Sequence, residues 1–151
     1  MIGLLQRVSH AEVRVGGETV GKIGRGLLVL VAVHRDDTPQ DIARLAERLL
    51  GYRVFPDDEG RMNRSVRDIE GGLLLVPQFT LTADTKKGTR ASFTKGAAPE
   101  MASDYFDRLA AACSAELEEV AKGRFGADMQ VSLTNDGPVT FWLETNSGSV
   151  T

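Results

Sequence analysis

The run Leu27-Leu28-Val29-Leu30-Val31-Ala32-Val33 constrains the fold more than any other stretch of the chain. An unbroken apolar segment of this length, rich in β-branched residues, is typical of a strand that is covered on both faces. Before it, residues 2–8 and 12–15 favour strands, and Gly16-Gly17 favours a turn into a further short strand. The first part of the chain therefore predicts neighbouring strands around one buried strand.

A helix is predicted directly after this run. Asp36-Asp37-Thr38-Pro39 has the polar residues and the early proline that are typical of a helix start, and Gly51 closes the helix. The apolar residues of this segment share one helical face: Ile42, Leu45, Ala46, Leu49 and Leu50. This amphipathic pattern predicts a helix that packs one side against the strands.

Residues 73–76 indicate a second buried strand, which leads into Pro77-Gln78-Phe79-Thr80-Leu81 and then into a polar, basic loop. The longest helix is predicted from residue 99 to about residue 120. Its apolar stripe contains Tyr105, Leu109, Cys113 and Leu117. We expect Cys113 to be a packing residue, because no histidine lies near it in the sequence to activate a thiol.

The end of the chain predicts a hairpin of residues 129–134 and 139–144 around Asn135-Asp136-Gly137-Pro138. Proline lacks an amide hydrogen and cannot serve a central ladder, whereas Gly-Pro can bring bare backbone close to a ligand and tolerates a cis peptide. The same residues also support an ordinary turn between two strands. Strands first and helices interleaved later predict a single α+β domain over residues 1–145, with residues 146–151 as a disordered tail.

Composition excludes several classes of protein. Hydrophobic residues make up 42% and charged residues 26% of the chain, with a net charge of −3, so a broad basic face for nucleic acid is absent. One cysteine and two histidines leave no familiar zinc-binding pattern, and we expect no metal. The sequence shows no signal peptide and no apolar run of about 18 residues, so we expect a cytoplasmic protein without a membrane segment.

Few side chains offer conventional catalytic chemistry, so backbone groups must carry much of any reaction. The best side-chain candidate is Thr80, at the end of a predicted buried strand, although a β-branched residue at such a position is more often a packing residue of the strand. Lys86, Lys87 and Arg90 follow in the basic loop, which is either a solvated loop or a phosphate-binding segment.

Several motifs occur together in one order along the chain. They are Gln6-Arg7-Val8, Gly60-Arg61-Met62-Asn63, Gln78-Phe79-Thr80-Leu81, Lys87-Gly88-Thr89-Arg90, Gly123-Arg124-Phe125-Gly126-Ala127-Asp128-Met129-Gln130-Val131 and the run from Asn135 to Phe141. Together they resemble the D-aminoacyl-tRNA deacylases over nearly the whole chain. The resemblance implies a homodimer without cofactors, built from a curved, barrel-like mixed or antiparallel sheet and two packed helices.

The resemblance also implies a reaction. The family hydrolyses the ester between a D-amino acid and the 3′-terminal adenosine of tRNA, and also removes glycine from mischarged tRNA. In that family the peptide matching Gly137-Pro138 is cis and enters the partner's pocket, where its carbonyls exclude L-amino acids. Arg7 would hold this segment in place. Glycine, which has no side chain, would escape the exclusion.

The other half of the implied site matches Gln78, Phe79 and Thr80 as the catalytic segment. The Phe79 amide would act as an oxyanion-type donor, and Met129 and Pro77 would line the substrate pocket. Lys86, Lys87 and Arg90 would contact tRNA. We favour a water nucleophile aided by the 2′-hydroxyl of the tRNA over the Thr80 hydroxyl, which has no base beside it in sequence.

Two positions depart from the family pattern. Pro77 replaces the usual serine and removes a hydroxyl and an amide hydrogen, and Ala91 replaces a common proline in the basic loop. Two alternatives remain open: a non-catalytic dimeric RNA-binding protein on the same scaffold, and a deacylase with a trans Gly-Pro peptide that accepts small L-amino acids. Arg7 favours the cis arrangement over the second alternative.

Overall fold

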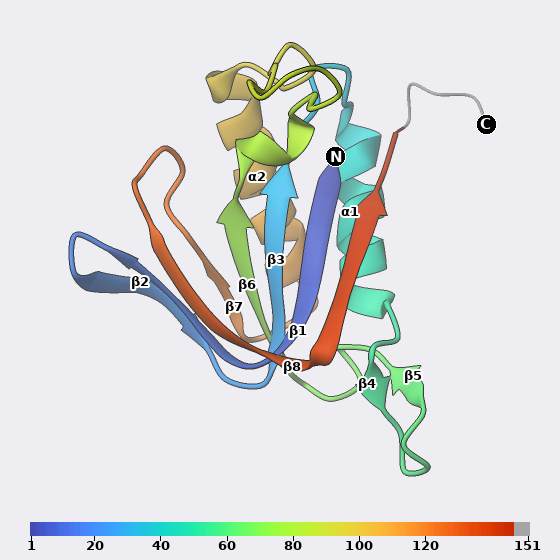
Figure 1. The fold of residues 1–151 in the computed structure, drawn as a ribbon. Helices are drawn as coiled ribbons and strands as arrows, with labels where there is room; N and C mark the ends of the chain where they lie inside the picture. Colours follow the sequence, from blue (N-terminus) through green and yellow to red (C-terminus); the bar gives the residue numbers. More distant parts are fainter. Residues whose placement is uncertain (147–151) are drawn as a thin grey trace.

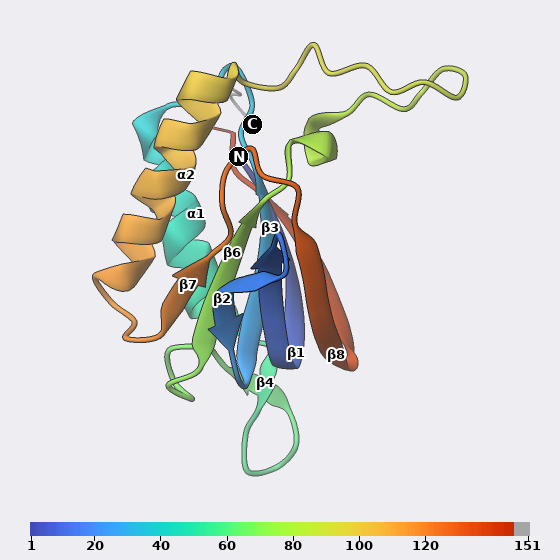
Figure 2. The same ribbon diagram turned by 90° about the vertical axis from the view of Figure 1, so that its left-hand side faces the viewer.

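The computed structural model describes residues 1–146. It contains a strongly curved six-stranded mixed sheet, two helices packed on one face of that sheet, and a small separate hairpin (Figure 1, Figure 2). The strands are β1 (Ile2–Val15), β2 (Glu18–Ile23), β3 (Gly26–Ala32), β4 (Phe55–Pro56), β5 (Met62–Arg64), β6 (Gly72–Pro77), β7 (Val120–Lys122) and β8 (Gln130–Glu144). The helices are α1 (Pro39–Gly51) and α2 (Pro99–Ser114), and a short 3-10 helix, η1, spans Phe79–Thr82. The predicted α+β architecture is confirmed.

The apolar run that anchored the prediction forms β3, in the middle of the sheet. It pairs antiparallel with β1 and parallel with β6. Leu27, Leu28 and Val29 are fully buried, as expected of a strand covered on both faces. Two segments predicted as separate strands, residues 2–8 and 12–15, belong to the single long strand β1.

The sheet curls until its edges nearly meet. Gly21 of β2 lies so close to β7 that a Cβ atom there would sit 2.9 Å from the carbonyl oxygen of Lys122. The main core lies between the sheet and the helices, where Leu5, Val29 and Leu75 face α1 and α2. A second apolar cluster fills the inside of the curl: Val8, Ala11, Val13, Ile23, Leu28, Leu74 and Val76.

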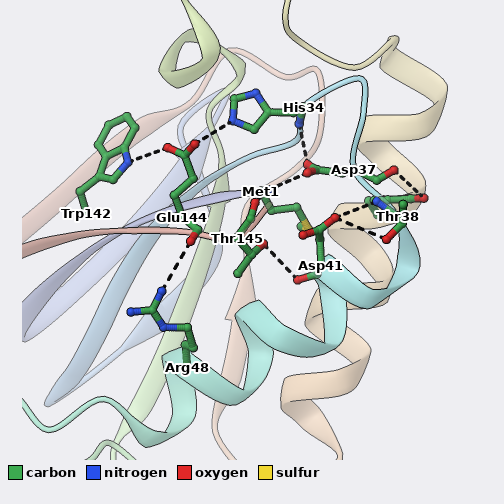
Figure 3. Close-up of polar contacts among 10 residues, drawn as sticks. Met1, His34, Asp37, Thr38, Asp41, Arg48, Trp142, Glu144 and Thr145 are labelled. Carbon is green, nitrogen blue, oxygen red and sulfur yellow. Dashed lines mark hydrogen bonds and ion pairs between the residues drawn. The ribbon is translucent and has the colours of Figure 1, made fainter. Parts of the chain in front are cut away.

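Helix α1 begins at the predicted residue, and a polar cluster fixes its start (Figure 3). The Asp41 carboxylate accepts the Thr38 N–H at 2.9 Å, which satisfies a backbone donor ahead of the helix. The Met1 amino group donates to the Asp37 carboxylate at 2.8 Å and to the Thr145 carbonyl at 2.7 Å. These contacts join the start of β1, the end of β8 and the turn before α1.

The predicted extent of the second helix is wrong. Helix α2 ends at Ser114, and Val120 lies in β7, which pairs in parallel with β6. Leu117 is buried, and its apolar side chain therefore extended the helical stripe in the sequence. In the structure it lies in the turn between α2 and β7. Pairing with β6 outweighs the local helical pattern.

The predicted C-terminal hairpin is also wrong. Residues on both sides of Gly137-Pro138 belong to one strand, β8, which runs antiparallel along β1 from Arg14↔Gln130 to Ile2↔Glu144. The proline is accommodated by a bulge in this strand rather than by a turn. Of the tail predicted over residues 146–151, all but Asn146 lies outside the described residues.

Candidate functional site

The carboxyl end of β6 opens into an apolar cavity of about 510 Å³. Its lining comes from β6, η1, the start of α2, the loop before β8 and the start of β8: Val76, Pro77, Gln78, Phe79, Ala97, Pro99, Ala102, Phe125, Gly126, Ala127, Met129 and Val131. Four predicted site residues, Pro77, Gln78, Phe79 and Met129, therefore lie in one place. A concave, mostly apolar pocket with a few polar groups is the usual form of a small-molecule site.

The cavity forms here because β6 stops at Pro77 and the chain turns into η1. The Gln78 N–H still bonds the Val31 carbonyl at 2.7 Å, and the Leu81 N–H closes the first turn on the Gln78 carbonyl at 3.2 Å. The first amides of a helix have no acceptor within the helix, so the N–H groups of Phe79 and Thr80 are available to a ligand.

Thr80 is not at the end of a buried strand, as predicted, but in η1, where it is exposed. Its hydroxyl accepts a hydrogen bond from the Gln78 side-chain amide, its one side-chain partner within the described residues. An amide donor cannot take a proton from the hydroxyl. Phe79 is 63% exposed, and its ring packs in a tilted arrangement against Phe93, with 5.2 Å between the ring centroids. The aromatic surface beside the cavity is therefore open to a partner.

The basic loop between η1 and α2 extends away from the body of the protein (Figure 2). Lys86, Lys87 and Arg90 are all exposed on it. A bridge between Asp84 and Ser92 holds the two arms of the loop together. The loop begins at the cavity because it follows η1 directly.

Gly137 and Pro138 lie in the bulge of β8, and the peptide bond between them is cis. The trans arrangement of one alternative is therefore not the one in this structure. Gly137 has φ +146°, and a Cβ atom there would lie 2.7 Å from Val139 Cγ2. The Arg7 guanidinium donates from Nε to the Asp136 carbonyl at 2.8 Å and from Nη1 to the Val54 carbonyl at 2.6 Å. Arg7 thus contacts the bulge, as expected.

The two groups of predicted site residues lie at opposite ends of the sheet. Arg7 pairs with Leu27 and Leu27 with Leu73, whereas Pro77 lies four residues farther along β6 (77 − 73). At about 3.3 Å per residue and about 4.8 Å per strand, Arg7 and Pro77 are roughly 16 Å apart. Figure 1 shows η1 above β6 and the middle of β8 at the other end. One chain does not bring Gly137-Pro138 to the cavity.

The described residues offer no reactive thiol, metal-binding cluster or membrane-spanning helix. Burial raises the pKa of the Cys113 thiol from 9.0 to about 12, so the thiol stays neutral and is a core residue, as predicted. Residues 1–146 contain no cluster of three or more His, Cys, Asp or Glu side chains that could hold a metal ion. Across the same residues, no helix is long and apolar enough to cross a membrane.

Some residues of the site were not among the sequence candidates. Phe125, Ala127 and Val131 line the cavity, and their only sequence signal was membership of the stretch from Gly123 to Val131. Asn135, whose side chain closes the bulge, was named only within a predicted turn and within the run from Asn135 to Phe141, and was given no role of its own.

Comparisons with known proteins identify the family of the chain. The family model described as D-Tyr-tRNA(Tyr) deacylase matches residues 4–144. The D-aminoacyl-tRNA deacylase of Alkalilimnicola ehrlichii is 63% identical over 144 residues, which cover 95% of this chain and 96% of that protein.

Solved structures are similar as well. A structure described as a c-Myc DNA unwinding element binding protein has a TM-score of 0.93 and 36% identity, and covers 97% of this chain and 100% of that one. A probable eukaryotic D-amino acid tRNA deacylase has a TM-score of 0.78 at 19% identity, covers 94% of this chain and 97% of that one, and shows the shared fold alone. From the family model and the relatives, the chain belongs to the D-Tyr-tRNA(Tyr) deacylase family.

Proposed function

We propose that this protein hydrolyses the ester bond between a D-amino acid and the 3′-terminal adenosine of tRNA, releasing the free amino acid and the tRNA. The observation that carries the proposal is the meeting of Pro77, Gln78, Phe79 and Met129 around one apolar cavity in a chain of this family. The name of the 63% identical relative gives the substrate class.

The proposed chemistry uses backbone groups rather than an acid–base pair of side chains. Water attacks the ester carbonyl carbon, and the bond to the 3′-oxygen breaks as that oxygen takes up a proton. The Phe79 N–H stabilises the negative oxygen of the tetrahedral intermediate. The 2′-hydroxyl of the tRNA assists the water, because the Thr80 hydroxyl has only the Gln78 amide as a side-chain partner within residues 1–146. Gln78 and Thr80 position the ester.

A homodimer is part of the proposal, because the two halves of the site are too far apart to meet in one chain. Two features support it. Trp142 of β8, 51% exposed, lines up with half-buried Leu4 and Leu30 across neighbouring strands, on the sheet face that the helices leave uncovered. Phe79 is exposed at the edge of the cavity. An apolar surface of this kind is typical of a contact between proteins.

Selectivity for the D-amino acid would come from exclusion. In the dimer, the carbonyl groups of Gly137-Pro138 from one subunit occupy the space that an L-side chain needs in the cavity of the other subunit. A D-side chain points away from them, and glycine has no side chain to exclude. Glycyl-tRNA is therefore a second expected substrate.

The basic loop would supply the tRNA contacts. Lys86, Lys87 and Arg90 are exposed on the segment that leaves the cavity, where the acceptor stem would lie if the aminoacyl end occupies the cavity. The net charge of −3 makes such a local cluster necessary. A cytoplasmic location completes the proposal, since aminoacylated tRNA is used there.

The direct test is deacylation of matched D-Tyr-tRNA, L-Tyr-tRNA and Gly-tRNA by the wild type and by Gly137→Ala. The wild type is expected to release the D- and glycyl esters and spare the L-ester. The added Cβ would lie 2.7 Å from Val139 Cγ2 and displace the bulge, so Gly137→Ala should hydrolyse the L-ester as well. Gly24→Ala is the matched control, because nothing lies within 4 Å of a Cβ there.

A second candidate function, binding of nucleic acid without hydrolysis, is favoured by one observation. The solved structure with a TM-score of 0.93 is described as a DNA unwinding element binding protein. Retention of all three esters by a folded wild type that still binds tRNA would favour this candidate and contradict hydrolysis.

A further inference from the structure

The bulge of β8 leaves a gap in the β1–β8 ladder that backbone groups do not fill. Gln6 pairs with Thr140 and Val8 pairs with Asn135. An advance of two residues along β1 therefore corresponds to five residues along β8. The four residues 136–139 between these pairs lie outside the ladder. A segment released from its ladder needs other contacts to hold a single conformation.

The Asn135 side chain supplies these contacts. Its Oδ1 accepts the Val139 N–H at 2.7 Å, and its Nδ2 donates to the Thr140 hydroxyl at 2.9 Å and to the Val139 carbonyl at 3.3 Å. One amide thus closes the loop from Asn135 to Thr140 with both its donor and its acceptor. Serine or threonine, with a single hydroxyl, could not make the same set.

Arg7 holds the same segment from a different direction. Its two hydrogen bonds join the Asp136 carbonyl to the Val54 carbonyl, which fixes the bulge relative to the body of the protein. Asn135 instead fixes the two ends of the bulge relative to each other. Arg7 therefore controls where the segment lies, and Asn135 controls its internal shape.

We propose that Asn135 is a positioning residue for chiral selectivity, because its side chain sets the direction in which the Gly137 and Pro138 carbonyls point. This inference rests on the proposed function, in which those carbonyls exclude the L-amino acid. Asn135 touches neither substrate nor the reacting atoms, so its loss should raise hydrolysis of the L-ester and leave hydrolysis of the D-ester nearly unchanged.

The test compares Asn135→Ala with Asn135→Asp and measures kcat/KM for D-Tyr-tRNA and L-Tyr-tRNA. Aspartate can accept both the Val139 N–H and the Thr140 O–H, so it should keep the two shorter bonds of the clamp and lose only the 3.3 Å bond to the Val139 carbonyl. We expect Asn135→Ala to reduce the D-to-L ratio by about tenfold or more, through the L-ester, and Asn135→Asp to stay within about threefold of the wild type. Thr134→Val is the control, since Thr134 precedes Asn135 on β8 and its hydroxyl contacts His10 of β1 rather than the bulge.

A second readout does not depend on activity. Hydrogen–deuterium exchange of the Val139 amide should accelerate in Asn135→Ala and remain slow in Asn135→Asp, because Asn135 Oδ1 is its acceptor. If Asn135→Ala does not fold, Thr140→Val replaces it, since it breaks one bond of the clamp and retains the bond to Val139.

An unchanged D-to-L ratio in folded Asn135→Ala, or an equal loss for both esters, would overturn the inference. Failure of the proposed function looks different, because the wild type itself would then spare the D-ester. If the wild type is inactive, the exchange experiment still tests the clamp. Equally slow exchange of the Val139 amide in the wild type and in Asn135→Ala would show that Asn135 does not hold it.

Discussion

The end of β6 and the middle of β8 both contain backbone groups outside regular secondary-structure pairing, but these groups are treated in opposite ways. At the end of β6, the chain turns into η1 and leaves the Phe79 and Thr80 amides without intrahelical acceptors, beside a cavity of about 510 Å³. At the bulge of β8, the side chains of Asn135 and Arg7 bind the backbone from both sides. One region keeps its backbone groups available to a ligand, and the other fixes them in place.

The largest effect on activity is expected when a backbone donor is removed from the first region, at the end of β6. Phe79→Pro eliminates the N–H, and a proline fits the first position of a helix. Phe79→Ala keeps the N–H and loses the same aromatic ring. We expect kcat for D-Tyr-tRNA to be about 100-fold lower in Phe79→Pro than in Phe79→Ala, the usual cost of one oxyanion donor.

The comparison of Phe79→Pro with Phe79→Ala also separates the two regions, because neither substitution changes a residue of the bulge. The D-to-L ratio should therefore be similar in Phe79→Ala and the wild type. Equal kcat values for two folded variants would show that the Phe79 amide has no part in the reaction.

A smaller effect is expected from the basic loop, which extends the first region toward tRNA. Replacing Lys86, Lys87 and Arg90 with alanine should raise KM for D-Tyr-tRNA and leave kcat and the D-to-L ratio unchanged. Each lost phosphate contact should reduce the slope of log affinity against log salt by about 0.7 to 0.9. Binding measured at several salt concentrations checks this, with exposed Lys22 of β2 as the control site. An unchanged slope would remove the loop from the tRNA contact.

The order of these effects follows from the difference between the regions. Changes near η1 act on the rate or on substrate affinity, whereas changes in the bulge act on the choice between D- and L-esters.

The smallest effect comes from Cys113, which lies in the helical core and belongs to neither region. The pKa of the Cys113 thiol is about 12 in the folded state, above the ordinary value of 9.0. The contribution of the neutral thiol to the free energy of unfolding is therefore complete below pH 9 and declines as pH rises from 9 toward 12. The loss is about 1.4 kcal/mol per pH unit at most. Urea unfolding at pH 7 and pH 10 should show a smaller decline for Cys113→Ala than for the wild type, with deacylation at pH 7 unchanged. Equal declines would contradict the buried neutral thiol.

The sequence predicts the elements whose signal is local. The apolar run of β3 and the capped, amphipathic segment of α1 both form where predicted, because burial and capping act within a few residues. The residues that line the cavity at the end of β6 were also identified in part, from the motif Gln78-Phe79-Thr80-Leu81.

The elements that were predicted wrongly depend on partners far away in the sequence. Pro138 indicated a break between two strands, but β1, more than a hundred residues earlier, pairs with β8 on both sides of the bulge. Three residues of β7 form a strand only because β6 offers them an edge. The separation of Arg7 from Pro77 follows from strand order, which local patterns do not encode.

The central claim, that the two regions of one site come from different subunits, is tested most directly in mixed dimers. Gly137→Ala subunits, expected to hydrolyse both esters, are exchanged with an excess of Phe79→Pro subunits, whose bulge is intact. Each Gly137→Ala subunit then receives an intact Gly137-Pro138 segment from its partner. We predict that L-Tyr-tRNA hydrolysis falls by about tenfold while D-Tyr-tRNA hydrolysis persists. Unchanged L-ester hydrolysis, with subunit exchange verified by differently tagged chains, would contradict a site shared between subunits.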